Sequence, residues 1–184
     1  MNVAAYTAAG ALSSALVGSG LGLLGAAVLP VHVGRLGAVA LLALALLALA
    51  RESGLVALPL PQVGRQTNGS WAKTLELTPA AVLWGLDIGL VFTTWLNLSG
   101  AWVLAALAFL AGSPAFGAAL FVAYWLGRAF SVWIGPLLAE SSTETSRLLA
   151  TFYDQRRLFR AVHVAGLACT VPVLASWIVT GTSL

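Results

Sequence analysis

Long apolar stretches separated by short polar segments dominate this sequence. The stretches cover residues 3–29, 34–50, 80–111, 115–138 and 161–179. A helix needs about 20 predominantly apolar residues to cross the ~30 Å hydrocarbon core of a bilayer. The pattern therefore predicts an all-α membrane protein with about five transmembrane helices, forming a single polytopic membrane domain over residues 1–184.

The third stretch, 80–111, is long for one straight crossing and short for two. The turn Gly112-Ser113-Pro114 separates it from the next stretch. Irregular backbone is tolerated at membrane depth where protein buries it. We predict one helix broken near Asn97–Gly100, and a re-entrant pair is the alternative.

Composition excludes a water-soluble domain. Hydrophobic residues make up 60% of the chain and charged residues only 8%, whereas soluble domains carry about a quarter charged residues. Most of the surface must therefore face lipid, so the bilayer is the expected partner, together with possible membrane protein partners. Most basic residues lie in loops, which argues against nucleic-acid binding. A single cysteine, Cys169, excludes an intrachain disulfide or dithiol.

The distribution of basic residues predicts the orientation. The polar loops 51–79 and 139–160 contain seven of the nine Lys and Arg residues, while the opposite side has Arg35 and one span contains Arg128. Basic loops stay in the cytoplasm. We therefore expect cytoplasmic loops at 51–79 and 139–160, an N-terminus inside and a C-terminus outside.

The second basic loop also contains a helix-start pattern. Ser141-Ser-Thr-Glu144 matches a capping box, in which the first and fourth residues cap each other's backbone N–H groups. An apolar stripe follows it. We expect an amphipathic helix lying on the inner membrane surface.

Two charged residues lie within predicted spans. Asp87 and Arg128 are at depths that differ by roughly 5 Å at 1.5 Å per residue, which a long Arg side chain can bridge. Charges at this depth cost several kcal/mol unless they are paired or hydrated. They form either a structural ion pair or part of a solute or proton pathway.

A polar patch lies close to Asp87 in the sequence. Its members are Thr93, Thr94, Asn97 and Ser99. On a continuous helix Thr93 and Asn97 share a face, because they are four residues apart. Such groups either line a pathway or hydrogen-bond a neighbouring helix.

Small residues and single histidines complete the candidates. Glycines four apart let helices approach closely, and here they are Gly18, Gly22, Gly85 and Gly89. His32 is expected near the outer surface and His163 near the inner one, so they cannot form a haem pair at one level. We predict no catalytic residue, metal site or cofactor.

Two groups of short motifs suggest a family. One extends from Gly89-Leu-Val-Phe92 through Trp95 and Gly100 to Gly117-Ala-Ala-Leu and Tyr124-Trp-Leu-Gly127, and the other comprises Gly10 to Gly25 followed by Arg35–Ala50. They resemble the fourth and fifth helices, and the second and third helices, of the CcdA family. These are thiol-reductant carriers of cytochrome c maturation that share a membrane domain with DsbD. The resemblance implies a bundle truncated from a 3 + 3 inverted repeat, in the bacterial inner (cytoplasmic) membrane.

The chain departs from that family at the reactive positions. The family's first helix, which carries one reactive cysteine, has no counterpart, and the second cysteine falls near Leu98. Thiol–disulfide exchange needs a thiolate and a disulfide, so no catalytic residue is carried over. Three functions remain open: a small-solute permease-like protein, a non-catalytic membrane subunit or assembly factor, and a cofactor-dependent redox relay. An enzyme is the less favoured reading.

Overall fold

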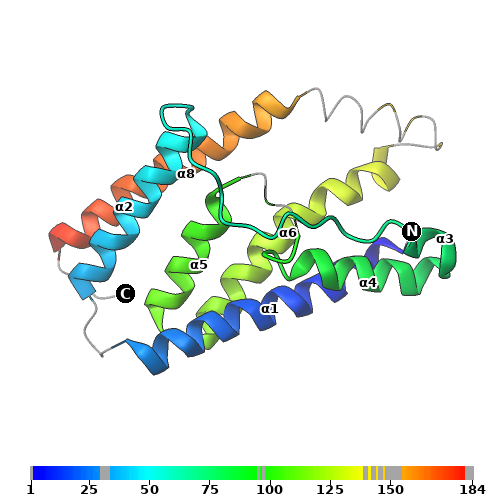
Figure 1. Cartoon of the computed structure of the whole chain (residues 1–184), viewed down its shortest axis with the longest axis horizontal. Coiled ribbons are helices and arrows are strands. Elements are labelled where there is room, and N and C mark those ends of the chain that lie inside the picture. Colours follow the sequence, from blue (N-terminus) through cyan, green and yellow to red (C-terminus); the bar gives the residue numbers. More distant parts are fainter. Residues whose placement is uncertain are drawn as a thin grey trace.

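Every element in the described part of the chain is a helix. The computed structural model describes residues 2–29, 34–94, 96, 98–138, 141, 144, 147 and 155–180. Its helices are α1 (Val3–Val28), α2 (Gly34–Glu52), α3 (Trp71–Thr74), α4 (Leu77–Gly89), α5 (Gly100–Ala111), α6 (Pro114–Leu138) and α8 (Arg156–Thr180) (Figure 1). The predicted all-α class is confirmed for these residues.

Four of these helices are long and apolar enough to cross a membrane. They are α1, α2, the 114–134 part of α6 and the 157–180 part of α8. Large apolar side chains project outward from them, such as Leu36, which is 80% exposed, and Val179, which is 84% exposed. Exposed apolar surface of this extent is typical of helices that face lipid. The chain is therefore an α-helical membrane protein.

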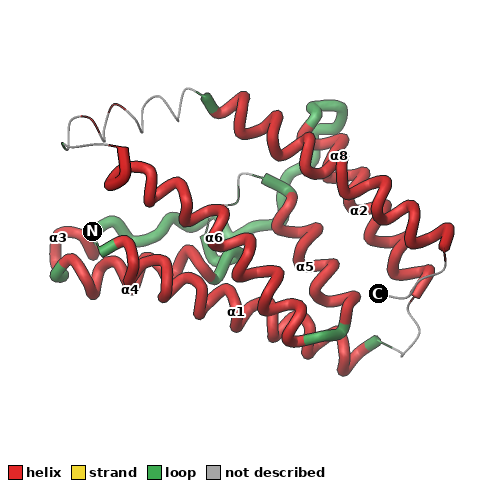
Figure 2. Tube along the Cα trace, turned by 180° about the vertical axis from the view of Figure 1, so that it is seen from behind, coloured by secondary structure: helices red, strands yellow, loops and turns green. Residues whose placement is uncertain are grey.

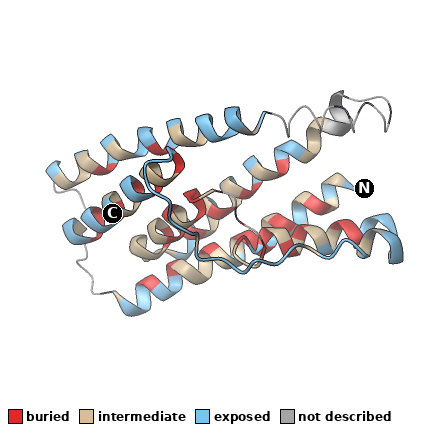
Figure 3. Ribbon diagram, turned by 45° about the horizontal axis from the view of Figure 1, so that its top comes forward, coloured by how far each residue is buried: buried red, intermediate tan, exposed pale blue. Residues whose placement is uncertain are grey.

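Helix α1 is the centre of the larger group of helices. Helix α6 returns antiparallel to it, so that the Trp125 indole N–H donates to Thr7 O at 2.8 Å near one end, while the Ser19 hydroxyl lies 3.3 Å from Pro114 O toward the other. Helix α4 runs parallel to α1, with Asn2 Nδ2 3.3 Å from Thr78 Oγ1. Figure 3 shows buried residues gathered where these helices meet.

The predicted broken helix is two short helices, α4 and α5, which follow α1 in succession. Helix α4 ends beside the middle of α1, where the Ser14 hydroxyl donates to Gly89 O at 2.7 Å. Helix α5 ends beside the far end of α1, because a Cβ on Gly25 would lie 1.8 Å from Phe109 O. Gly112 then ends α5 with a left-handed φ of 56°, as the predicted turn requires. The break lies between Gly89 and Gly100, so it begins earlier than the predicted Asn97–Gly100.

Helices α2 and α8 form a second, antiparallel pair, seen from behind in Figure 2. The Arg160 Nε group at the start of α8 donates to Glu52 O at the end of α2, at 2.7 Å. Leu41, Ala45 and Ala48 of α2 pack in one cluster with Val103 of α5 and Leu167 of α8. Helix α5 is thus the element that joins the pair to the α1–α4–α6 group.

Most of the predicted inner-surface helix lies outside the described residues. The capping box at its start is described, and it is confirmed. Glu144 N donates to Ser141 Oγ and Ser141 N donates to Glu144 Oε2, both at 3.2 Å.

Candidate functional site at the helix break

The break between α4 and α5 begins with a strained residue. Val91 has φ 61° and is fully buried. This left-handed conformation is unfavourable for a β-branched residue and costs of order 1–3 kcal/mol, which the surrounding structure must offset. The chain is therefore held in a defined shape here.

Asp87, on the last turn of α4, is the buried charge at the start of the break. It is 8% exposed, and its Oδ1 forms an ion pair with Arg65 Nη2. Arg65 also donates from Nε to Thr93 O at 3.3 Å. The Oδ2 atom of Asp87 is buried without a hydrogen-bond partner among the described residues. Asp87 thus keeps one free acceptor at the break.

The predicted ion pair between Asp87 and Arg128 is wrong, since Arg65 takes that place. The Arg128 guanidinium instead lies 5.8 Å from the centre of the Tyr124 ring. Residues four apart share a helix face, so Arg128 stacks along Tyr124, whereas Trp125 and Ala129 form the buried face of α6. Matching two residues by depth alone does not take account of the direction in which each side chain points.

A strap of extended chain, residues 53–70, crosses the break between the end of α2 and α3 (Figure 1). The Gln62 Oε1 atom accepts a hydrogen bond from Leu96 N at 2.7 Å. At the other end, the Trp84 indole N–H donates to Asn68 O at 3.0 Å. A broken helix leaves backbone groups that must be satisfied, and the strap satisfies two of them, Leu96 N through Gln62 and Thr93 O through Arg65. The sequence predicts only an ordinary loop for these residues.

The predicted polar patch lies in the break and not on a helix face. Thr93 Oγ1 donates to Asp87 O at 3.0 Å. Thr94 is 5% exposed, and its hydroxyl has no hydrogen-bond partner in the described part of the chain. Thr93 and Thr94 are not helical, and neither are the other described residues between α4 and α5. Asn97 lies outside the described residues.

Ser99, at the far end of the break, binds a second buried carboxylate. Glu52 is 4% exposed, and its Oε1 accepts from Ser99 N at 3.0 Å and from Ser99 Oγ at 2.9 Å. The Glu52 side chain therefore caps the N-terminus of α5, where the helix dipole favours a negative charge. Arg51 Nη1 lies 2.5 Å from Glu52 Oε1, and Arg160 Nε lies 3.9 Å from Oε2.

His163 of α8 packs against the first residue of α5. A Cβ on Gly100 would lie 2.4 Å from His163 Cε1, so only glycine leaves room for the ring. The His163 Nε2 atom is buried and has no hydrogen-bond partner among the residues described. The sequence predicts His163 as a single histidine near the inner surface, and it contains no signal for Glu52 as a site residue.

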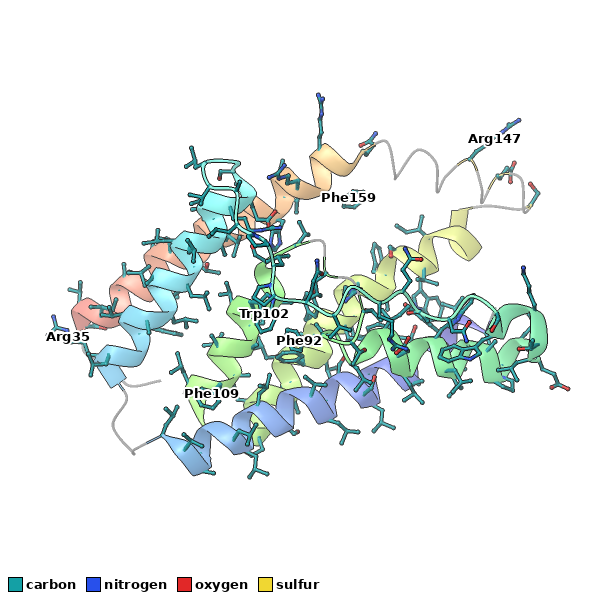
Figure 4. The ribbon with its side chains drawn as sticks, viewed as in Figure 1. Arg35, Phe92, Trp102, Phe109, Arg147 and Phe159 are labelled. Atoms are coloured by element: carbon teal, nitrogen blue, oxygen red, sulfur yellow. The ribbon has the colours of Figure 1, made fainter. Side chains whose placement is uncertain are left out.

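Aromatic side chains pack around the break. The ring centres of Phe92 and Trp102 are 4.8 Å apart (Figure 4), and those of Phe92 and Phe121 are 6.2 Å apart. Val91 and Leu96 belong to the same cluster. Together these side chains fix the break against the apolar core.

The four predicted packing glycines all lie in close contacts within the chain. Gly18 faces Gly117 and Gly22 faces Ser113, both across the interface of α1 with α6. Gly85 and Gly89 of α4 face α1 from the other side, beside Tyr6 and Gly10. A Cβ on any of the four would lie 2.4 Å or less from a neighbouring atom.

Comparison with known protein families, curated proteins and solved structures gives no match. In the part of the chain that the structure describes, no three His, Cys, Asp or Glu residues are grouped so as to hold a metal ion. The site is therefore interpreted from its own residues.

Proposed function

We propose that the protein is a permease for a small polar or charged solute, with its binding site at the break between α4 and α5. The observation that carries this is a helix broken midway along α1, with a buried carboxylate at each end of the break. Broken helices in transporters supply backbone and charged groups to a site near the bilayer midplane. Buried charges inside a membrane domain are costly and typically functional.

In this proposal α4 and α5 together make one crossing, which gives five in all. Their 13 and 12 residues correspond to roughly 20 and 18 Å of helix, each too short for a ~30 Å core. Helix α4 ends beside the middle of α1 and helix α5 ends beside its far end, which supports counting them together. An N-terminus inside, a C-terminus outside and the bacterial inner membrane belong to the same proposal, as does the descent from a CcdA-type inverted repeat.

Reporter fusions test this topology. Fusions after Met1 and at position 66 in the strap are expected to read cytoplasmic, and a fusion at Leu184 is expected to read external, because five crossings place the termini on opposite sides. Alkaline phosphatase and a fluorescent protein, fused at the same positions, provide reciprocal readouts. A cytoplasmic C-terminus rules out five crossings.

The division of the helices into two groups supports a transport role. Helix α1 packs mainly on α4 and α6, while α2 packs on α8. Rocking of one helix group against another around a fixed site is a common form of alternating access. The break lies beside α5, the helix that contacts both groups.

The transport test uses purified protein in proteoliposomes. Radiolabelled amino acids, carboxylates, sugars and alkali cations are offered in turn, and one class is expected to show saturable, protein-dependent uptake. Asp87→Asn is expected to lower the initial rate by about tenfold or more, because the charge at the break is lost. Cys169→Ser, at an exposed position of α8, serves as the matched control with unchanged uptake.

The same test addresses the alternatives of a membrane subunit and a redox relay. If no solute class shows saturable uptake, and the variants unfold at the same temperature as the original protein, the permease proposal is wrong. A membrane subunit that packs through its glycines needs these faces open to partner helices, and the four glycines named above are occupied within the chain. A cofactor-dependent redox relay likewise predicts no saturable uptake of any of these solute classes.

A further inference from the structure

A second cluster of polar groups lies where α2, α5 and α8 meet, and the proposed Asp87 site does not use it. We call this contact the seam and define it by Glu52, Ser99, Gly100, Arg160 and His163. Glu52 holds Ser99 by two hydrogen bonds, Arg160 holds the end of α2, and His163 packs on Gly100. The seam therefore joins the α2–α8 pair to the rest of the molecule.

Positively charged groups outnumber negatively charged ones at the seam. Helix α2 contributes Arg51 and the carboxylate of Glu52, helix α8 contributes Arg160 and His163, and α5 contributes the uncharged hydroxyl of Ser99. With His163 neutral, two guanidinium groups face one carboxylate. A proton on His163 adds a positive charge that the Glu52 carboxylate attracts, but it places this charge on a ring whose Nε2 atom is buried without a hydrogen-bond partner in the described residues, and burial disfavours a charged group.

His163 is the group at the seam that can change its charge under physiological conditions. Its ordinary pKa of about 6.5 lies in that range, unlike those of Arg and Glu. Its Nε2 atom is buried without a hydrogen-bond partner in the described residues. A buried nitrogen in this state provides an open position for a proton, and no existing hydrogen bond has to be broken.

We propose that His163 is a proton-binding site whose charged form loosens the seam. In the neutral form the ring rests on Gly100 and Glu52 caps α5. A proton taken up from acidic solution puts a charge on this buried ring, so the ring moves toward water and α8 separates from α5. The Glu52 carboxylate is drawn toward the charged imidazole, so its hold on Ser99 weakens. The seam is closed at neutral and alkaline pH and opens in acid. The coupling of this proton site to transport rests on the proposed function. The proton site itself can be measured without a transported solute.

The first experiment measures access to the seam with a reporter cysteine. Leu98→Cys is introduced into a Cys169→Ser background, because Leu98 is half-buried beside Ser99. Its labelling by a water-soluble maleimide is compared between about pH 8 and pH 5.5, above and below the ordinary imidazole pKa. At each pH, this rate is divided by the labelling rate of the same protein carrying His163→Gln. The ratio corrects for the change of thiol reactivity with pH.

The normalised labelling rate is expected to rise by about fivefold or more on acidification, a typical coupling between two sites. Glu52→Gln removes the carboxylate on which the seam depends, so it is expected to abolish the rise. His32→Gln, which changes the only other histidine of the chain, is expected to keep it. A flat normalised rate, or a rise lost equally in His32→Gln, overturns the proposal.

A second measurement covers the case in which His163→Gln or Glu52→Gln does not fold. In a His32→Gln protein with isotope-labelled histidine, His163 gives the single imidazole NMR signal. Its chemical shift is followed from about pH 8 down to about pH 5 and is expected to change as the imidazole gains a proton. An imidazole that does not titrate in this range overturns the proton site. If the uptake test fails but His163 titrates, the permease proposal is wrong and the proposal of a proton site is retained.

Discussion

Replacing Arg65 with methionine is expected to destabilise the folded protein by about 2–3 kcal/mol, whereas Asp87→Asn is expected to cost less than about 1 kcal/mol. The asymmetry follows from burial. The Asp87 side chain is 9% exposed and that of Arg65 is 49% exposed. Loss of Arg65 leaves a carboxylate buried without its counter-charge, while loss of the Asp87 charge leaves a guanidinium that water can reach.

The measurement is a double-mutant cycle of Arg65→Met and Asp87→Asn, with the stability of each variant measured by thermal or denaturant unfolding in detergent. The double variant is expected to recover most of the stability lost in Arg65→Met, because no unpaired charge remains. Arg128→Met is the matched control, since a cation–π contact of this kind is worth about 0.5–1 kcal/mol. Equal losses in Arg65→Met and Arg128→Met would show that Asp87 does not depend on Arg65.

Local features of the fold could be predicted from the sequence because their causes are local. The apolar stretches correspond to helices, the turn at Gly112 ends α5 with the expected left-handed glycine, and Ser141 and Glu144 cap each other. Each of these depends on residues within a few positions of one another. The existence of a break also follows locally, from a stretch too long for one crossing that contains polar residues.

The partners of the buried charges could not be predicted, because they depend on tertiary contacts. Glu52 and Ser99 are 47 residues apart, and Glu52 looks in the sequence like the polar end of a helix. Arg65 reaches Asp87 only because the strap folds back over the break. A hydropathy profile gives the depth of a residue but not the direction of its side chain, so the pairing of Asp87 with Arg128 followed from the wrong criterion.

The extent of the break was underestimated for a related reason. Asn97–Gly100 contains the polar and small residues that sequence rules associate with helix ends. The helix actually ends earlier, after Gly89, where apolar Val91 takes a left-handed conformation. Packing of Val91 in the aromatic cluster overrides its intrinsic preference. The hydrogen bonds from the strap to Thr93 O and Leu96 N then satisfy backbone groups that have no partner within a helix.

A large effect of a small substitution is expected at Gly18. Gly18→Ala is expected to destabilise the protein by about 3 kcal/mol, the upper end of the cost of overpacking, because its Cβ would lie 2.0 Å from Gly117 O. That neighbour is backbone in the facing helix, so no side chain can rotate away. Gly20→Ala, two residues further along α1, has no atom within 4 Å of its Cβ. It is expected to be neutral or to stabilise by up to about 1 kcal/mol through helix propensity.

Unfolding of the two variants in the same detergent measures the difference directly. A large gap between Gly18→Ala and Gly20→Ala means that α6 occupies the small-residue face of α1 within a single chain. That face is then closed to helices of another protein, which weakens the subunit alternative. If both alanine variants unfold like the original protein, the backbones of α1 and α6 are further apart than described. The glycine face would then be open to a partner, and a membrane subunit would explain this chain better than a permease.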